Sequence, residues 1–150
     1  MSDHWIGIIP LDPFFVPSDD AIAQAENFMA DLMPEAEEIK GEITDSVRFR
    51  DCGANLEAIR CPFCATELSS EWWSEQMSDD WDDGFDLRPV NLPCGHLVGS
   101  LNDLRYDFDQ GFSRFILDAM NPNIGVLSPA DVQRFEAILG CPVKVIYQHI

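Results

Sequence analysis

The sequence predicts an α+β fold, in which an antiparallel or mixed sheet carries helices on one face. Runs of alternating apolar and polar residues near both chain ends are typical of strands. Segments with helical spacing follow capping serines and are grouped between the strands instead of alternating with them. With 150 residues and 46% apolar content, the chain is long enough for one domain, residues 1–150, with an ordinary core.

The N-terminal elements have clear boundaries. Residues 5–9 form an apolar run that ends at Pro10 and predicts a strand. Ser18 is a favourable N-cap, and apolar residues at helical spacing predict a helix that continues to Met33 and ends at Pro34.

The middle of the chain is predicted to form a hairpin. Residues 43–51 alternate as a strand, residues 52–55 supply a turn, and residues 56–60 supply the returning strand. Two further strands are expected at residues 85–92 and 104–109.

The C-terminal part is predicted to contain two helices and a strand. Apolar residues between 112 and 120 recur at helical spacing, so a helix is expected there after Gly111. Ser128 and Gly140 bound a second helix, and residues 143–150 alternate as a strand. This order of elements favours a ferredoxin-like core with a further unit inserted at about residues 61–96.

Two short motifs predict that inserted unit. Cys61 and Cys64 are separated by two residues, so both sulfurs can reach one ion, and Cys94 and His96 can supply two further ligands from a second turn. Four protein ligands close the coordination shell, which is typical of a structural zinc site.

This pair of motifs resembles the paired knuckles of a zinc ribbon. It departs from the usual knuckle at Ala65, where a glycine commonly follows the second cysteine. This departure leaves the fourth ligand open between His96 and Cys52. The motifs also resemble the first half of a RING finger, but only Cys141 and His149 follow His96, so the second site and ubiquitin ligase activity are not expected.

Composition restricts the possible partners. The net charge of −18 disfavours nucleic acid and anionic membranes, both of which attract basic proteins. A basic protein partner is favoured instead, through electrostatic steering. Five cysteines, three of them in metal-binding spacing, suit a reducing cytoplasm better than a disulfide framework.

The segment between the two cysteine motifs is unusually rich in tryptophan and acidic residues. Aromatic anchors dominate interface energetics, so this segment predicts a contact surface for a protein partner. Its residues are Trp72, Trp73, Asp79, Asp80, Trp81, Asp82 and Asp83.

The function predicted from these features is that of a non-enzymatic, acidic, zinc-stabilised protein-binding module. Immunity proteins that neutralise nucleic-acid-cleaving toxins share its charge and size, so an inhibitor of that kind, or an adaptor, is expected. The alternative is a metal-dependent hydrolase or thiol redox enzyme centred on Cys61, Cys64 and Cys94. The sequence carries no glycine-rich phosphate loop and no Gly-x-Ser-x-Gly or His-Glu-x-x-His motif.

Overall fold

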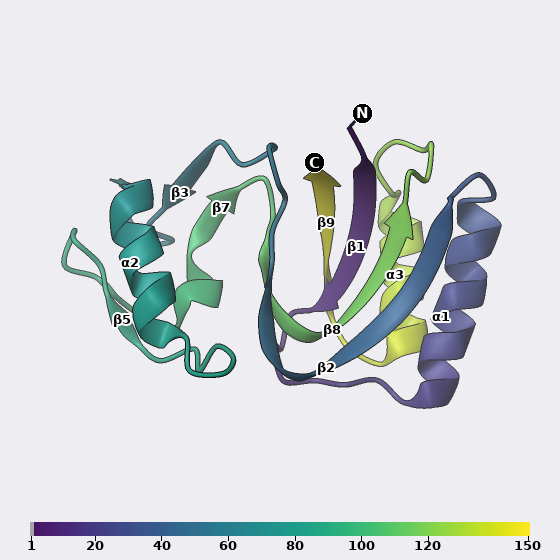
Figure 1. The fold of residues 1–150 in the computed structure, drawn as a ribbon, viewed down its shortest axis with the longest axis horizontal. Coiled ribbons are helices and arrows are strands. Elements are labelled where there is room, and N and C mark those ends of the chain that lie inside the picture. Colours follow the sequence, from purple (N-terminus) through teal and green to yellow (C-terminus); the bar gives the residue numbers. More distant parts are fainter. Residues whose placement is uncertain (1) are drawn as a thin grey trace.

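The computed structural model describes residues 2–150. Its main sheet has four antiparallel strands in the order β2-β8-β1-β9. Their bounds are β1 (His4–Pro10), β2 (Glu38–Arg50), β8 (Gly111–Met120) and β9 (Val143–His149). Helices α1 (Asp19–Leu32) and α3 (Pro129–Leu139) cover one face of this sheet, on the right of Figure 1. The predicted α+β class is confirmed, and the main sheet is antiparallel.

Both long helices begin at the serines that the sequence indicates. The Ser18 hydroxyl accepts a hydrogen bond from the Ala21 amide, and the Ser128 hydroxyl accepts one from the Asp131 amide. Gly140 ends α3 in a left-handed conformation, φ 79°. The predicted helices at residues 18–33 and 128–140 are therefore confirmed, as are the first and last strands.

Residues 111–120 form strand β8, so the predicted helix at this position is wrong. The strand lies between β1 and β2 and is buried on both faces. Phe115 and Leu117 pack toward the helices, while Ile116 packs on the opposite face of the sheet. A strand buried on both faces has apolar residues at almost every position. Some of these residues are then three or four positions apart, as on a helix face, so periodicity alone does not separate the two.

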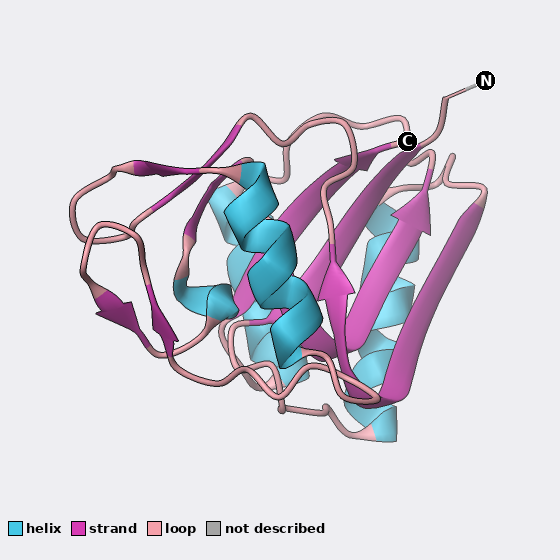
Figure 2. Cartoon of the chain, turned by 60° about the vertical axis from the view of Figure 1, so that its left-hand side comes forward, coloured by secondary structure: helices cyan, strands magenta, loops and turns pink. Residues whose placement is uncertain are grey.

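Between β2 and β8 the chain leaves the main sheet and builds a second unit, residues 51–110, which we call the lobe. Figures 1 and 2 show the lobe on the side of the main sheet opposite α1 and α3. It holds a three-stranded sheet in the order β4-β3-β7, a two-stranded sheet β5-β6 and helix α2. The bounds are β3 (Ala58–Arg60), β4 (Glu67–Leu68), α2 (Ser70–Asp80), β5 (Val90–Asn91), β6 (Leu97–Val98), the 3-10 turn η1 (Leu101–Asp103) and β7 (Arg105–Asp107). The predicted insertion at residues 61–96 lies within the lobe.

The predicted hairpin of residues 43–51 and 56–60 does not form. Strand β2 pairs with β8, and β3 pairs with β4 and β7. The strands predicted at 85–92 and 104–109 are also shorter than expected. Leu87 and Phe108 have φ angles of 55° and 72°, and such left-handed residues interrupt an extended backbone.

A bulge bends the ladder between β2 and β8. Ile43 pairs with Phe115 and Arg48 pairs with Ser113, so residues 44–47 stand opposite Arg114 alone. Val47 at the end of the bulge and Phe112 beyond it enter a second core that belongs mainly to the lobe. The two ends of the β2–β8 pair therefore contribute side chains to different cores. Figure 1 shows β2 curving from one core to the other.

The six elements around the lobe follow the order β1, α1, β2, β8, α3, β9. This is the β-α-β-β-α-β order of a ferredoxin-like unit. The assignment of the main sheet and its helices to a ferredoxin-like fold stays a prediction. Among residues 2–150, no helix has both the length and the apolar character needed to cross a membrane.

Gly53 lies where the lobe meets the end of β9. Gly53 has φ +63°, and a Cβ atom at this position would lie 2.2 Å from the backbone oxygen of His149. We expect Gly53→Ala to lower the free energy of unfolding by about 2 to 4 kcal/mol, because strain and a backbone clash add together. The matched control is Gly125→Ala, which meets no atom within 4 Å and should change the urea midpoint little. Equal midpoints for the two variants would contradict this role of Gly53.

Candidate metal centre

The first pair of candidate ligands lies on the turn that joins β3 to β4. The Cys61 amide donates to the Thr66 carbonyl at 2.9 Å, and the Ala65 amide donates to the Cys61 carbonyl at 3.0 Å. The Phe63 amide points at the Cys61 sulfur, 3.4 Å away. These bonds close a tight loop in which both sulfurs of the pair can approach one point. Cys61 is buried, and Cys64 is exposed.

The second pair lies on the turn that joins β5 to β6. The Leu92 amide donates to the His96 carbonyl at 2.8 Å, and the Gly95 amide donates to the Leu92 carbonyl at 2.9 Å. Gly95 has φ 95°, a conformation that a glycine adopts without cost. This turn holds the Cys94 sulfur and the His96 ring on the side that faces the first pair.

The two turns bring all four ligand atoms together. The three sulfurs and one imidazole nitrogen lie within 4.8 Å of one another. The His96 Nδ1 atom is 3.5 Å from the Cys61 sulfur and 3.4 Å from the Cys94 sulfur. A tetrahedral centre with zinc-like bond lengths would place nitrogen and sulfur about 3.6 Å apart. The cluster Cys61, Cys64, Cys94 and His96 therefore fits a metal ion, as the motif spacing predicts.

Cys52, the alternative fourth ligand, is not part of this cluster. It is fully buried beside the main sheet, and its sulfur lies 3.5 Å from the Gln110 side-chain oxygen and 3.8 Å from the Phe108 carbonyl. His96 occupies the fourth position instead. All five cysteines are free, so no disulfide competes with metal binding.

The cluster changes the acidity of its thiols. The hydroxyl and amide of Thr66 lower the pKa of Cys64 to about 6, because both groups stabilise the thiolate. The pKa of Cys94 is raised: the His96 amide lowers it, but burial and the two neighbouring sulfurs oppose that effect. Cys64 is therefore ready to bind a metal ion near neutral pH.

The departure from the usual knuckle at Ala65 is visible in the backbone. Ala65 has φ 61°, in the left-handed region that favours glycine. We expect Ala65→Gly to raise the free energy of unfolding by about 1 kcal/mol, because the left-handed conformation costs alanine about that much. The same replacement in exposed helix, Ala30→Gly in α1, should have the opposite sign. Urea denaturation of the metal-loaded variants measures both, and a destabilised Ala65→Gly variant would contradict the expectation.

The predicted contact surface divides into buried and exposed residues. Trp72 and Trp73 pack against the core of the lobe, and the Trp73 indole donates to the Tyr106 hydroxyl at 3.1 Å. Asp80 is buried, and its carboxylate accepts hydrogen bonds from the amides of Leu87 and Arg88 at 2.7 and 2.9 Å. Asp80 is thus a structural residue of the lobe and is not available for contact with a partner.

The remaining predicted contact residues are exposed. Trp81 is 44% exposed, packs edge-on against Phe85, and carries the Arg48 guanidinium over its ring. Asp79, Asp82 and Asp83, its near neighbours in the sequence, are exposed as well. One tryptophan and three aspartates of the predicted set therefore remain accessible.

Two exposed apolar residues beside the metal cluster were not predicted as contact residues. Phe63 is 66% exposed and lies against the His96 ring, with ring centroids 5.4 Å apart, and Leu97 is 59% exposed. Phe63 lies between Cys61 and Cys64 in the β3–β4 turn, and Leu97 follows His96 as the first residue of β6. That position in the motif is the signal that identifies them.

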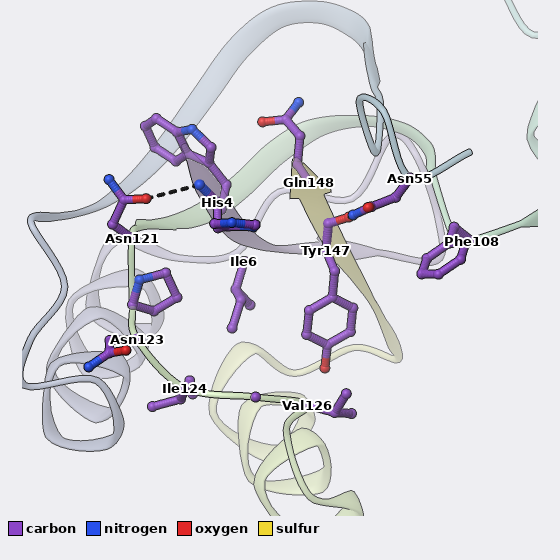
Figure 3. A pocket seen from close by; sticks show the side chains of 13 residues that line it. His4, Ile6, Asn55, Phe108, Asn121, Asn123, Ile124, Val126, Tyr147 and Gln148 are labelled. Atoms are coloured by element: carbon purple, nitrogen blue, oxygen red, sulfur yellow. Dashed lines mark hydrogen bonds between the residues drawn. The ribbon is translucent and has the colours of Figure 1, made fainter. Parts of the chain in front are cut away.

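A hollow of about 740 Å³ lies elsewhere, and none of the four candidate ligands lines it. Figure 3 shows it between strands β1 and β9 and the loop that carries Ile124 and Val126. The His4 amide donates to the Asn121 side chain at its edge, and the His4 ring stacks on His149. Its lining contains no aspartate, glutamate, lysine or arginine.

Comparison with known proteins found no relative of this chain. No protein-family model, curated protein or solved structure matches the chain.

Proposed function

We propose that the four-residue cluster holds a zinc ion with a structural role. Three thiolates and one imidazole are the donor set that zinc prefers in structural sites. Four protein ligands leave no open position for a substrate or an activated water. Mass spectrometry of the protein purified without chelators tests this proposal, with one equivalent of zinc as the expected content.

The function that we propose is binding of a basic protein partner in the cytoplasm, as an inhibitor or adaptor and without enzymatic activity. The observation that carries it is the exposed Trp81, with the exposed aspartates Asp79, Asp82 and Asp83 near it in the sequence, on a chain of net charge −18. Indole supplies apolar contact area, and the carboxylates supply attraction to lysine and arginine. Phe63 and Leu97 add apolar surface beside the metal cluster.

An inhibitor of the immunity-protein kind is the most specific form of this proposal. A nucleic-acid-cleaving toxin has a basic active site that must accept phosphates. Exposed carboxylates of the lobe would occupy the phosphate positions, and Trp81 would provide buried contact area. Inhibition of nuclease activity by stoichiometric amounts of this protein is then the expected functional readout.

The test is a capture experiment with matched variants as bait. The zinc-loaded protein should retain a basic protein at about 0.05 M salt and release it at about 0.3 M salt, because exposed charges are screened. Asp82→Asn/Asp83→Asn should weaken retention, and Trp81→Ala should raise the Kd of the purified pair at least about tenfold. The control Phe14→Ala removes an aromatic side chain of similar exposure from the loop before α1, and should bind as the parent does. Capture of acidic proteins alone, or equal binding by all variants, would refute the proposal.

A thiol redox function is the second candidate, and the exposed Cys64 favours it. Its pKa of about 6 makes this sulfur mainly a thiolate at neutral pH, which is the reactive form. A redox role requires a reversible Cys61–Cys64 disulfide and reduction of a substrate disulfide such as that of insulin. A structural zinc site predicts that the metal-loaded protein does neither.

A further inference from the structure

A small cleft lies on the face of the main sheet that α1 and α3 leave free. One wall is the sheet itself, with Trp5 and Gly7 of β1 and Asp118 of β8. The other wall is the end of β2, Phe49 and Arg50, which the bulge has turned back across the sheet. Its volume is about 160 Å³. The cleft is distinct from the metal cluster and from the contact surface of the lobe.

Asp118 is the acidic group of the cleft. Within residues 2–150, its carboxylate makes no hydrogen bond and no ion pair within 4.0 Å. Burial raises its pKa to about 6, although the nearby Arg50 guanidinium lowers it in part. Gly7, its neighbour on β1, keeps the space above it open, because a Cβ atom there would lie 2.9 Å from the Asp118 Oδ1 atom. A half-buried carboxylate without a donor is costly unless something pairs with it.

Arg50 is the basic group of the cleft, and the bulge fixes its position. Its Nε atom donates to the Ser113 hydroxyl at 3.2 Å, and its Nη2 atom donates to the carbonyls of Ser113 and Arg114 at 3.3 Å each. Its Nη1 atom has no acceptor in the described part of the chain. The guanidinium is therefore held rigidly with donors to spare, and it forms no ion pair with Asp118 within 4.0 Å.

Two other polar side chains of the cleft, Asp51 and Gln148, are bonded to each other. One Asp51 oxygen accepts from the Gln148 side chain at 3.1 Å, and the other accepts from the Gly53 amide at 3.0 Å. Trp5, Ile116 and Ile146 give apolar surface. Beside them, the Asp118 carboxylate and the Arg50 guanidinium are near each other without a direct bond.

We propose that this cleft binds a small zwitterion of the α-amino acid class. The ligand carboxylate accepts hydrogen bonds from Arg50, and the ligand ammonium donates to Asp118. A ligand with a single charge would leave the opposite charge of the cleft without a partner, which disfavours it. The cleft volume of about 160 Å³ suits a small ligand such as glycine or alanine.

The proposal is tested by titrating the zinc-loaded protein with glycine and L-alanine while recording amide and indole NMR signals. Saturable shifts are expected at the Gly7 amide and the Trp5 indole, which lie in the cleft. Acetate and methylammonium, which each carry one of the two charges, should bind at least about tenfold more weakly, a difference of 1.4 kcal/mol. Equal binding of either ion, or no saturable shift up to about 10 mM glycine, would overturn the proposal and leave a water-filled cleft.

Two variants locate the binding. Asp118→Asn keeps the shape of the side chain and removes its charge, and it should weaken glycine binding at least about tenfold. Gly7→Ala fills the space above Asp118 and should weaken it too. The control Gly125→Ala lies away from the cleft and should bind glycine as the parent does. Unchanged glycine binding in both cleft variants would place the ligand elsewhere and contradict the assignment.

Discussion

Cys64→Ala is expected to unfold the lobe while the main sheet and its two helices stay folded. The strands of the lobe contain only two or three residues each, and such short pairs have little stability of their own. The metal would tie the β3–β4 turn to the β5–β6 turn, which are far apart in the sequence. Structural zinc binds zinc-finger peptides with an apparent free energy of about 10–16 kcal/mol, comparable to the whole stability of a domain. Loss of one ligand should therefore cost several kcal/mol.

Cys64 separates the effect of the metal from the effect of packing. Its side chain is exposed, so alanine at this position removes no core contact. Three of the four tryptophans lie in α2 or directly after it, so near-ultraviolet circular dichroism reports on the lobe, while the Trp5 indole NMR signal reports on the main sheet. The control is Cys141→Ala, a cysteine outside the cluster that packs against the first core. If Cys64→Ala and Cys141→Ala alter the lobe equally, no metal ion stabilises it.

The metal cluster was predictable from the sequence because its ligands come in pairs within single turns. The spacing of Cys61 and Cys64, and of Cys94 and His96, restricts each pair whatever the rest of the chain does. The choice of His96 over Cys52 was not predictable. It depends on the turn of Cys52 beside Gln110, which buries the thiol at the main sheet.

The helices α1 and α3 were predictable because local groups decide their ends. A serine hydroxyl caps each one, and Pro34 or Gly140 follows each one. Strand β8 was not predictable, since its helical spacing of apolar residues is overridden by pairing with β1 and β2 on either side. Tertiary contacts, not local preference, decide the conformation of this segment.

The separate roles of the lobe's aspartates are also set by tertiary structure. Asp79 to Asp83 read alike in the sequence, yet Asp80 alone turns inward to bind the amides of Leu87 and Arg88. The cleft of Arg50 and Asp118 also could not be predicted from the sequence, because it too depends on tertiary structure. A bulge opposite Arg114 brings together two residues that are 68 positions apart in the sequence.

Asp118→Asn is expected to stabilise the protein at neutral pH. The pKa of Asp118 rises from 3.8 to about 6 on folding, chiefly through burial, while Arg50 lowers it and Glu42 and Glu38 raise it. Lys40, its neighbour in register on β2, forms no ion pair with it within 4.0 Å. The folded state therefore binds the Asp118 proton more tightly than the unfolded state does. Its stabilising contribution is fully present below about pH 4 and is lost as the pH rises through 6.

The asparagine variant has no such proton to lose. At pH 7.5 it should exceed the parent in free energy of unfolding by about 2 kcal/mol, within the limit of about 3 kcal/mol that this rise in pKa allows. The difference should fall toward zero as the pH is lowered to about 4. The control Glu75→Gln removes one exposed negative charge from α2, so it measures the effect of lowering the net negative charge alone. Its free energy of unfolding should gain little relative to the parent at any pH. Urea denaturation across this pH range gives the free energy of unfolding of all three proteins. If the difference between Asp118→Asn and the parent does not change with pH, the raised pKa of Asp118 is contradicted. A stabilising Asp118→Asn variant that no longer binds glycine would indicate that the chain keeps a costly charge for its ligand, as functional sites often do.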